Sequence, residues 1–387
     1  MERRKKIAVV FGTRADTIKL APIILELKKE RKHFRVVTIA TGQHRQMLDQ
    51  VLQVFKITPD HDLNIMQVGQ TLAAITKNAI EVLDKVLTLE KPDLVLVQGD
   101  TTTTFVGSLA AFYRGIPVGH VEAGLRTNDK ANPFPEEINR RLTSCIADLH
   151  FAPTMTAKKA LLREHIDLRS IFITGNSVID ALNLSVKKHH RFSRQTLNDL
   201  ALKKSRKLLI TMHRRENWGE PMRQAARAIR RLALLYPDCD VIFPVHINPA
   251  VRRIVYPVLG IVPNVHLIEP LDYLDFVSLM AMSYLIITDS GGVQEEGPSL
   301  GKPVLVLREV TERPEAVDYG TARIVGLNEE KIVREAVRLM KDTRAYRAMA
   351  LATNPYGDGR ASRRIVGVIK KHFGLSSTVI KELRPGE

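Results

Sequence analysis

The feature that most constrains this chain is a regular alternation of short apolar runs with longer stretches of helical periodicity. The apolar runs of the first half are residues 7–12, 35–40, 94–97, 117–121, 149–152 and 171–174. Continuous apolar runs, without polar alternation, are typical of strands buried on both faces of a parallel sheet. Strands that alternate with helices in this way predict a doubly wound α/β fold.

The pattern then restarts, which predicts a second domain of the same kind. The strand candidates of the second half are residues 208–212, 241–245, 265–268, 285–288 and 304–307. We expect two Rossmann-like domains that face each other across a cleft. Their predicted extents are residues 1–182, a polar and basic connector at 183–206, and residues 207–360, with a last helix at 361–374 that crosses back onto the first domain.

Composition excludes several classes of protein. The net charge is +16, but aromatic residues make up only 5% and are not interleaved with the basic ones, so no nucleic-acid partner is expected. The two cysteines, Cys145 and Cys239, have no metal-ligand spacing and favour a reducing compartment. No apolar run approaches the ~20 residues of a membrane helix, so we expect a soluble, cytoplasmic protein without membrane insertion.

In open α/β sheets, ligands bind outside the carboxyl ends of the strands, so the residues after each strand matter most. Gly12-Thr13-Arg14 follows the first strand. A helix start after glycine offers N–H groups to an anion, and Arg14 and Lys19 add positive charge. The alternative is a plain turn between strand and helix. Neither GxGxxG nor GxxxxGK[ST] occurs, so NAD and P-loop chemistry are disfavoured and no cofactor is expected.

A second turn of this type follows residues 285–288. Its residues Ser290, Gly291 and Gly292 are small and suit a phosphate, and Glu296, one turn further on, suits ribose hydroxyls. The alternative is a helix cap followed by acidic first-turn residues. Two such turns in one chain predict a ligand that carries phosphate.

Acidic groups also follow strands or lie in loops of the first domain. Asp100, Glu122 and Glu136 are candidates for general acid–base catalysis, and His213, after the first strand of the second domain, is a candidate for proton transfer or pyrophosphate binding. A structural role is the alternative for each. No compact Asp-x-Asp occurs, so a metal site is not predicted.

Two further residues suit a nucleoside diphosphate. Arg313 is a natural partner for a diphosphate or for a carboxylate in the cleft. Phe276 suits stacking on a uracil, although core packing is the commoner role of a single phenylalanine.

A set of motifs spread over the chain carries a family resemblance. The motifs are Phe11-Gly12-Thr13-Arg14, Gln43-His44-Arg45-Gln46-Met47-Leu48-Asp49, Gly99-Asp100-Thr101-Thr102-Thr103-Thr104, Gly119-His120-Val121-Glu122-Ala123-Gly124-Leu125-Arg126-Thr127, Pro135-Glu136-Glu137, His213-Arg214-Arg215-Glu216, residues 289–296, Thr311-Glu312-Arg313-Pro314-Glu315 and Asn354-Pro355-Tyr356-Gly357-Asp358-Gly359. Through them the chain closely resembles the non-hydrolysing UDP-N-acetylglucosamine 2-epimerases of bacteria and archaea, over nearly its whole length.

The resemblance implies a glycosyltransferase-B-like fold, a homodimer, and a role in the synthesis of cell-surface polysaccharides. It implies interconversion of UDP-N-acetylglucosamine and UDP-N-acetylmannosamine by elimination of UDP, to 2-acetamidoglucal, and re-addition. The positions that match catalytic residues are Asp100, Glu122, Glu136 and His213. Those that match UDP contacts are Arg14, Lys19, Phe276, Ser290, Gly291, Gly292 and Glu296. Those that match a region where some members bind a second UDP-N-acetylglucosamine as activator are Gln43, His44 and Gln46.

The chain departs from the family pattern at a few positions. Ala15-Asp16-Thr17 stands where the family usually reads Pro-Glu-Ala, and Gly69 stands where activator-regulated members often carry Arg. The competing functions are a glycosyltransferase of the same fold, a hydrolysing epimerase, a 2-epimerase of another UDP-acetamido sugar, and a nucleotide-sugar sensor without catalysis.

Overall fold

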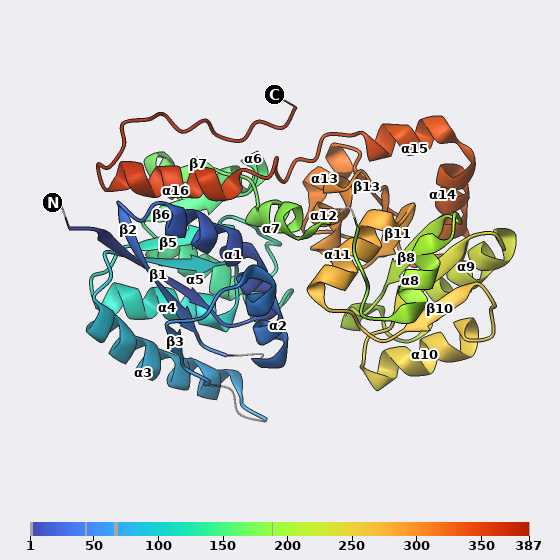
Figure 1. Cartoon of the computed structure of the whole chain (residues 1–387), viewed down its shortest axis with the longest axis horizontal. Helices are drawn as coiled ribbons and strands as arrows, with labels where there is room; N and C mark the ends of the chain where they lie inside the picture. Colours follow the sequence, from blue (N-terminus) through green and yellow to red (C-terminus); the bar gives the residue numbers. More distant parts are fainter. Residues whose placement is uncertain (1–2, 43–44, 66–68, 188, 387) are drawn as a thin grey trace. The chain divides into compact units, whose positions relative to one another are not determined.

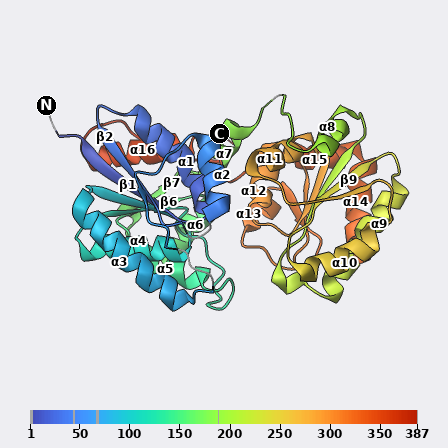
Figure 2. The same cartoon turned by 60° about the horizontal axis from the view of Figure 1, so that its bottom comes forward.

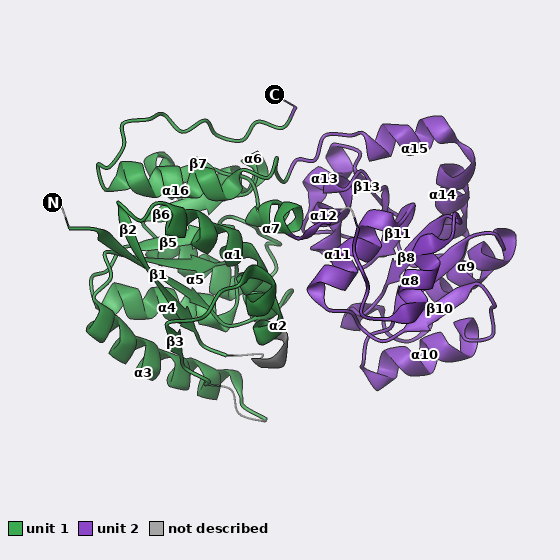
Figure 3. Cartoon of the chain, viewed as in Figure 1, with its two compact units in different colours: residues 1–184, 356–385, 387 green, residues 185–355, 386 purple. Residues whose placement is uncertain are grey.

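The chain forms two compact units, each built on one parallel sheet. The computed structural model describes residues 3–42, 45–65, 69–187 and 189–386, with only the backbone of residues 45–47. Unit 1 comprises residues 1–184 and 356–385, and unit 2 comprises residues 185–355 (Figure 3). The predicted fold class, two doubly wound α/β domains, is confirmed.

The sheet of unit 1 has seven strands in the order β3-β2-β1-β4-β5-β6-β7, and all of its pairs are parallel (Figure 1). Its strands are β1 (Lys5–Phe11), β2 (Phe34–Ala40), β3 (His61–Asp62), β4 (Leu94–Gln98), β5 (Val118–Val121), β6 (Leu149–Ala152) and β7 (Ile171–Ile173). The central strands β1, β4 and β5 are almost wholly buried, as expected for strands covered by helices on both faces.

Helices cover both faces of this sheet. They are α1 (Arg14–Lys29), α2 (Arg45–Phe55), α3 (Leu72–Glu90), α4 (Thr102–Tyr113), α5 (Glu136–Ile146), α6 (Met155–Arg163), α7 (Ser177–Ser185) and α16 (Ala361–His372), with a 3₁₀ turn at Leu168–Ser170. Figures 1 and 2 show α3 and α4 side by side along one face, and α1 beside α16 on the other. The helix α16, from the end of the chain, therefore completes the unit in which the chain begins.

Unit 2 repeats the design with six parallel strands in the order β10-β9-β8-β11-β12-β13. The strands are β8 (Lys207–Thr211), β9 (Asp240–Pro244), β10 (Val265–Ile268), β11 (Leu285–Thr288), β12 (Val304–Val306) and β13 (Ala322–Ile324). The helices are α8 (Gln195–Leu202), α9 (Glu220–Leu235), α10 (Pro249–Leu259), α11 (Tyr273–Met282), α12 (Val293–Ser299), α13 (Pro314–Asp318), α14 (Glu329–Lys341) and α15 (Thr343–Ala350), with a 3₁₀ turn at Arg215–Asn217.

The core of unit 2 follows from amphipathic helices laid on an apolar sheet. In α9, the side chains of Met222, Ala225, Ile229 and Leu232 recur at helical spacing and are all buried. They join residues of α10, α14 and the inner strands in one apolar cluster. Helices α10 and α14 therefore pack on the same face of the sheet as α9.

Two segments attach by specific contacts rather than by periodicity. Residues 189–206 belong to unit 2, where the Nε2 of His190 lies 2.6 Å from the Oδ1 of the buried Asp275, and the N–H of Ser193 donates to its Oδ2 (3.1 Å). The C-terminal segment extends the edge of the unit 1 sheet, because the N–H of Leu383 donates to the carbonyl of Ile173 at 2.9 Å.

The glycine at residue 124 is required by a close approach of two backbones. Its φ is +93°, and a Cβ built on it would lie 2.3 Å from the carbonyl oxygen of Ala157 in α6. Gly115 has a similar φ of +64°, but a Cβ there would meet nothing within 4 Å. Both glycines have a positive φ, but only at Gly124 would a Cβ collide with another part of the backbone.

We predict that Gly124→Ala lowers the free energy of unfolding by about 3 kcal/mol, the sum of backbone strain and overpacking. Gly115→Ala is the control and is expected to cost about 1 kcal/mol, from backbone strain alone. Urea unfolding of both variants measures the difference. Equal losses would show that α6 moves away freely and would contradict the packing argument.

Candidate active site

The carboxyl edge of the unit 1 sheet gathers the candidate residues of the first half. Strand β1 pairs with β2 on one side and with β4 on the other, so the connections after β1 and β4 leave toward opposite faces. This is the switch point at which open α/β sheets bind ligands. The turn Gly12-Thr13 follows β1, and Gly99-Asp100 follows β4.

The turn after β1 is closed by its own side chain, which corrects one expectation. The buried carboxylate of Asp16 accepts hydrogen bonds from the N–H groups of Gly12 (3.0 Å), Thr13 (2.7 Å) and Thr17 (2.8 Å). Burial raises the pKa of Asp16 to about 6 against the lowering effect of these donors. The N–H groups of Gly12 and Thr13 are therefore not available to a phosphate, and Arg14 and Lys19 are the cationic residues in the first two turns of α1.

Asp100 is held by a helix that follows it by forty residues. The Nη2 of Arg140, in α5, donates to the Oδ2 of Asp100 at 2.6 Å, and the side-chain amide of Asn139 donates to its carbonyl at 3.0 Å. The guanidinium is almost completely buried, while the carboxylate is partly exposed. The ion pair fixes the direction of Asp100 without covering it.

Glu122, after β5, sits in a conformation that costs energy. Its φ is +62°, in the left-handed region that costs an ordinary residue about 1–2 kcal/mol. The side chain is buried, forms an ion pair with Lys19 of α1, and accepts a hydrogen bond from the amide of Asn176 at 2.8 Å. Strain that is retained beside charged groups is typical of functional sites.

The buried imidazole of His120 supports the loop after β4. Its Nε2 lies 2.8 Å from the carbonyl oxygen of Gly99. Burial lowers the pKa of His120 to about 3, so the ring is neutral at physiological pH and donates to this carbonyl. It positions the backbone that leads to Asp100 without adding a charge.

Glu136 begins α5, one turn before Arg140, and both have polar atoms without partners. The Oε2 of Glu136 and the Nε of Arg140 are buried and make no hydrogen bond to any described residue, while the Nη1 of Arg140 is in an ion pair with Glu137 at 3.6 Å. Buried polar atoms in folded proteins are nearly always hydrogen-bonded. An acceptor and a donor on one helix face, beside Asp100, are therefore suited to a polar ligand.

The corresponding edge of unit 2 is organised by one buried carboxylate. Asp289, after β11, accepts hydrogen bonds through Oδ2 from the N–H groups of His213 and Arg214 (both 2.9 Å) and from the amide of Asn217 (3.1 Å). The Nδ1 of His213 lies 3.1 Å from Oδ1. Burial opposes ionisation, but the His213 side chain and these N–H donors outweigh it and lower the pKa of Asp289.

This pairing fixes the orientation of the His213 ring. A carboxylate at Nδ1 favours the tautomer whose proton is on that atom, which leaves Nε2 as the reactive nitrogen. The His213 side chain is 40% exposed, and its ring stacks on that of His246 with centroids 5.9 Å apart. The ring is thus held from two sides while its other edge remains accessible.

The Arg313 guanidinium forms ion pairs with carboxylates of unit 2. Its Nε donates to the Oε1 of Glu295 at 2.8 Å, and its Nη1 lies 3.0 Å from Glu312. Arg214 and Arg308 also pair with Glu312. Burial raises the pKa of Glu312, but the three guanidinium groups outweigh it and bring it to about 2. Arg214 also lies 3.9 Å from Glu216, so three guanidinium groups pair with three carboxylates in this network.

The Gly291-Gly292 turn lies directly against that network. A Cβ on Gly291 would lie 3.0 Å from a Glu312 oxygen and 3.4 Å from the Arg313 guanidinium carbon, so only glycine fits without displacement. The N–H of Ser290 donates to Thr288 Oγ1 at 2.9 Å. The N–H groups of Gly291 and Gly292 donate to no other described residue and lie beside the Arg313–Glu312 ion pair.

The remaining candidates are dispersed over unit 2 or lie outside the described residues. Glu296 is buried in the first turn of α12, and Phe276 is half-buried in the first turn of α11. Gln43 and His44 are outside the described residues, and so is the side chain of Gln46. Within the described residues, no group of three or more His, Cys, Asp or Glu side chains is arranged to hold a metal ion.

Three residues of these edges were not singled out from the sequence as functional. Arg140 could have been found from its spacing of four from Glu136, which puts both on one helix face. Asp289 was seen only as the start of a phosphate turn. Its pairing with His213 depends on β8 lying next to β11, which the order of a doubly wound sheet predicts. Asn176 gives no such signal.

The fold is shared with sugar-transferring enzymes. The glycotransferase of kitacinnamycin superposes with a TM-score of 0.61 over 95% of this chain and 99% of its own, at 13% identity. At that identity the likeness shows the fold alone, which is glycosyltransferase-B-like with two doubly wound domains.

Closer relatives define the family. The UDP-N-acetylglucosamine 2-epimerase family model matches residues 26–370. The UDP-N-acetylglucosamine 2-epimerase of Bacillus subtilis (strain 168) is 55% identical over 96% of this chain and 97% of its own. The crystal structure of the Neisseria meningitidis enzyme bound to UDP-GlcNAc has a TM-score of 0.87 at 50% identity, over 95% of this chain and 100% of that one. The chain belongs to the UDP-N-acetylglucosamine 2-epimerase family, whose members are isomerases.

We predict that Asp289→Asn lowers the free energy of unfolding by about 2 kcal/mol, because buried N–H donors lose a charged acceptor. Because the pKa of Asp289 is lowered in the folded state, its contribution is complete above the unfolded value of 3.8. The difference between variant and wild type is thus constant from about pH 5 to 8 and shrinks on further acidification. Urea unfolding at several pH values measures it, and a difference that grows toward acid pH contradicts the assignment.

Proposed function

We propose that this chain interconverts UDP-N-acetylglucosamine and UDP-N-acetylmannosamine, without net hydrolysis, by eliminating UDP and adding it back. Family membership supports the reaction class, and the Neisseria meningitidis relative was crystallised with UDP-GlcNAc. The sugar is engaged by unit 1 and the UDP mainly by unit 2.

The observation that carries the proposal is the pair of unpartnered groups on α5. The unpartnered Oε2 of Glu136 and Nε of Arg140 lie one helical turn apart. The Nη2 of Arg140 also donates to the Oδ2 of Asp100 at 2.6 Å. A hydroxyl or acetamido group supplies both a donor and an acceptor. Binding the sugar here would satisfy atoms that otherwise bear an uncompensated desolvation cost.

Features of unit 2 support its role in binding UDP. The N–H groups of Gly291 and Gly292 lie beside the Arg313–Glu312 ion pair, and backbone N–H groups in such turns bind phosphate oxygens well. We assign His213 to a pyrophosphate oxygen, Glu296 to the ribose and Phe276 to the uracil. We also assign Arg14 and Lys19 of α1 to contacts with UDP; the guanidinium of Arg14 favours departure of the diphosphate, and Lys19 is paired with Glu122.

The chemistry requires more than one acid–base group. A base removes the C2 proton, the electrons of that C–H bond form the C1–C2 double bond, and the C1–O bond breaks with its electrons on UDP. In the reverse step, an acid delivers a proton to the other face of C2 while the UDP oxygen bonds to C1. Because the two faces need different groups, we assign the proton transfers to Asp100, Glu122 and Glu136 together.

The other functions considered are less well supported. The relatives at about half identity are named as epimerases, so a glycosyltransferase rests on the fold alone. A hydrolysing epimerase would release free N-acetylmannosamine, and another UDP-acetamido sugar would replace the substrate while keeping the elimination step. Each leaves a different product.

We predict that the protein, in D₂O with UDP-N-acetylglucosamine and without added metal or NAD, produces the manno epimer with deuterium at C2. Proton NMR measures epimer formation and loss of the C2 signal together, and little free sugar accumulates. Stoichiometric free N-acetylmannosamine would indicate hydrolysis, and binding without exchange would contradict the proposed reaction.

We predict that Asp100→Asn and Glu122→Gln each lower kcat by roughly 10²–10⁴-fold, because each removes an acid–base group. Asp84→Asn is the control: it removes an equal charge from an exposed ion pair with Arg114, and such pairs contribute little. Circular dichroism of each variant reports folding. Near-normal kcat in both site variants would assign the proton transfers elsewhere.

We also infer a cytoplasmic homodimer that serves synthesis of cell-surface polysaccharides. The free thiols of Cys145 and Cys239 support a reducing compartment, and no helix of the described residues is long and apolar enough to cross a membrane. At the end of α4, Phe112 and Tyr113 are 61% and 65% exposed, and neighbouring apolar rings of this kind support an interface with a second copy.

We predict that the Phe112→Asp, Tyr113→Asp double variant halves the mass measured by light scattering after size exclusion, because it places charges in an apolar interface. Leu202→Asp, at a site that is 85% exposed in unit 2, is the control and should leave the mass unchanged. A wild-type monomer, or a double variant that stays dimeric, would contradict the assigned surface.

A further inference from the structure

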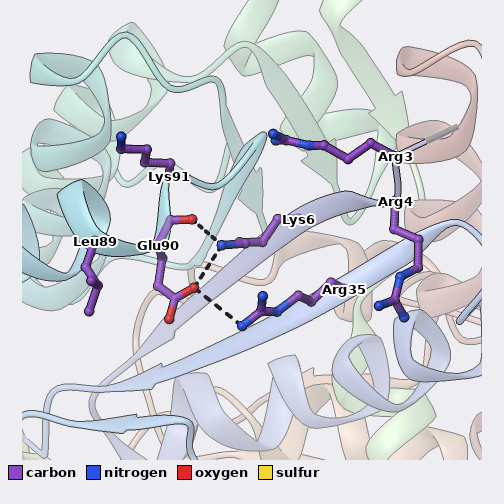
Figure 4. A pocket seen from close by; sticks show the side chains of 7 residues that line it. All are labelled: Arg3, Arg4, Lys6, Arg35, Leu89, Glu90 and Lys91. Atoms are coloured by element: carbon purple, nitrogen blue, oxygen red, sulfur yellow. Dashed lines mark hydrogen bonds and ion pairs between the residues drawn. The ribbon is translucent and has the colours of Figure 1, made fainter.

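A charged cavity lies at the amino end of the unit 1 sheet, at the opposite end of the strands from the candidate active-site residues of that unit. It has a volume of about 420 Å³ and is lined by Arg3, Arg4, Lys6, Arg35, Leu89, Glu90 and Lys91. These residues lie before or at the amino ends of β1 and β2 and at the carboxyl end of α3. Figure 4 shows Lys6 and Arg35 extending from the two strands toward Glu90.

The cavity has more cations than its carboxylates can balance. Glu90 is already paired, with the Nζ of Lys6 at 3.0 Å and the Nε2 of His61 at 2.8 Å. The hydrogen bond from His61, followed by that from Lys6, lowers the pKa of Glu90, so it is a carboxylate at neutral pH. Asp93, just outside the cavity, is paired with Arg3 at 3.2 Å.

Three cations therefore remain in surplus. Arg35 approaches Glu90 only to 3.9 Å, and its side chain is 58% exposed. Arg4 and Lys91 have no carboxylate partner among the residues that the structure describes. Lys6 donates to the carbonyl of Glu90 at the carboxyl end of α3, so the helix terminus accounts for the presence of this cation. The helix terminus does not account for the other cations.

The lining selects the chemistry of the ligand. Guanidinium groups present forked donors that match phosphate oxygens, and several cations around one cavity suit an anion of more than one charge. The volume is in the range of sites for small molecules. The lining contains no aromatic side chain, so it offers no platform for stacked bases and does not suit a single-stranded nucleic acid.

We propose that this cavity binds a small polyphosphate anion, either a free polyphosphate or the phosphate chain of a nucleotide. Lys6 and His61 neutralise Glu90, and Arg4, Arg35 and Lys91 provide the charge that holds the ligand. The site is separate from the proposed epimerase reaction, because the two lie at opposite ends of parallel strands.

Titration calorimetry of the full chain with tripolyphosphate, at low salt, tests the proposal. The Arg4→Glu, Lys91→Glu double variant reverses two surplus cations and should weaken binding at this site at least tenfold. The control is Arg230→Glu, Arg253→Glu, which changes the net charge equally at exposed positions of α9 and α10. It should bind tripolyphosphate as the wild type does, and unfolding temperatures confirm that both variants are folded.

Each outcome decides the matter. Unchanged binding in the Arg4→Glu, Lys91→Glu variant overturns the proposal, because it shows that the cavity is not the site. An equal loss of affinity in both double variants also overturns it, because it shows only a general effect of net charge. Selective loss supports it, and ATP then identifies the source: affinity equal to that of tripolyphosphate assigns the free polyphosphate chain, and tighter binding assigns a nucleotide. Duplex DNA that displaces tripolyphosphate at lower concentration than ATP would overturn the small-anion assignment.

Discussion

Parallel pairing between strands that are not consecutive in sequence, β1 with β4 and β8 with β11, is the constraint on which the rest of the structure depends. Because the first strand of each sheet has its second strand on one side and its fourth on the other, the following helices must cover opposite faces. The loops after these paired strands then diverge and leave backbone and side chains exposed at the edge. Asp100 and His213 lie in such loops.

The charges at these edges are of two kinds. Asp289 and Glu122 are buried and accept hydrogen bonds from donors of their own unit, which offset part of their desolvation cost in the folded chain. The Oε2 of Glu136 and the Nε of Arg140 are buried and make no hydrogen bond to any described residue. Groups of the first kind are held in a fixed orientation, and groups of the second kind gain most when a polar ligand binds.

The sequence predicted most of this fold because buried parallel strands are continuous apolar runs. It did not predict β3, which contains no apolar residue, or β13, whose middle residue is the exposed Arg323, because neither is a continuous apolar run. For the site, strand ends identified Asp100, Glu122 and His213, whose functional roles stay predictions. Partners were harder to predict, because Asn176 meets Glu122 only through tertiary folding of residues 54 apart.

The turn at Ala15-Asp16-Thr17 departs from the family pattern but keeps a closed, hydrogen-bonded structure. The shorter carboxylate of Asp16 still reaches the N–H groups of Gly12 and Thr13, and the hydroxyl of Thr17 donates to the carbonyl of Thr13 at 2.6 Å. The turn is thus stable without proline, but its N–H groups are occupied. We therefore propose that phosphate binding through backbone N–H groups involves Gly291 and Gly292, which lie beside the Arg313–Glu312 ion pair. At the turn before α1, a side-chain cation, Arg14, takes the place of these N–H groups.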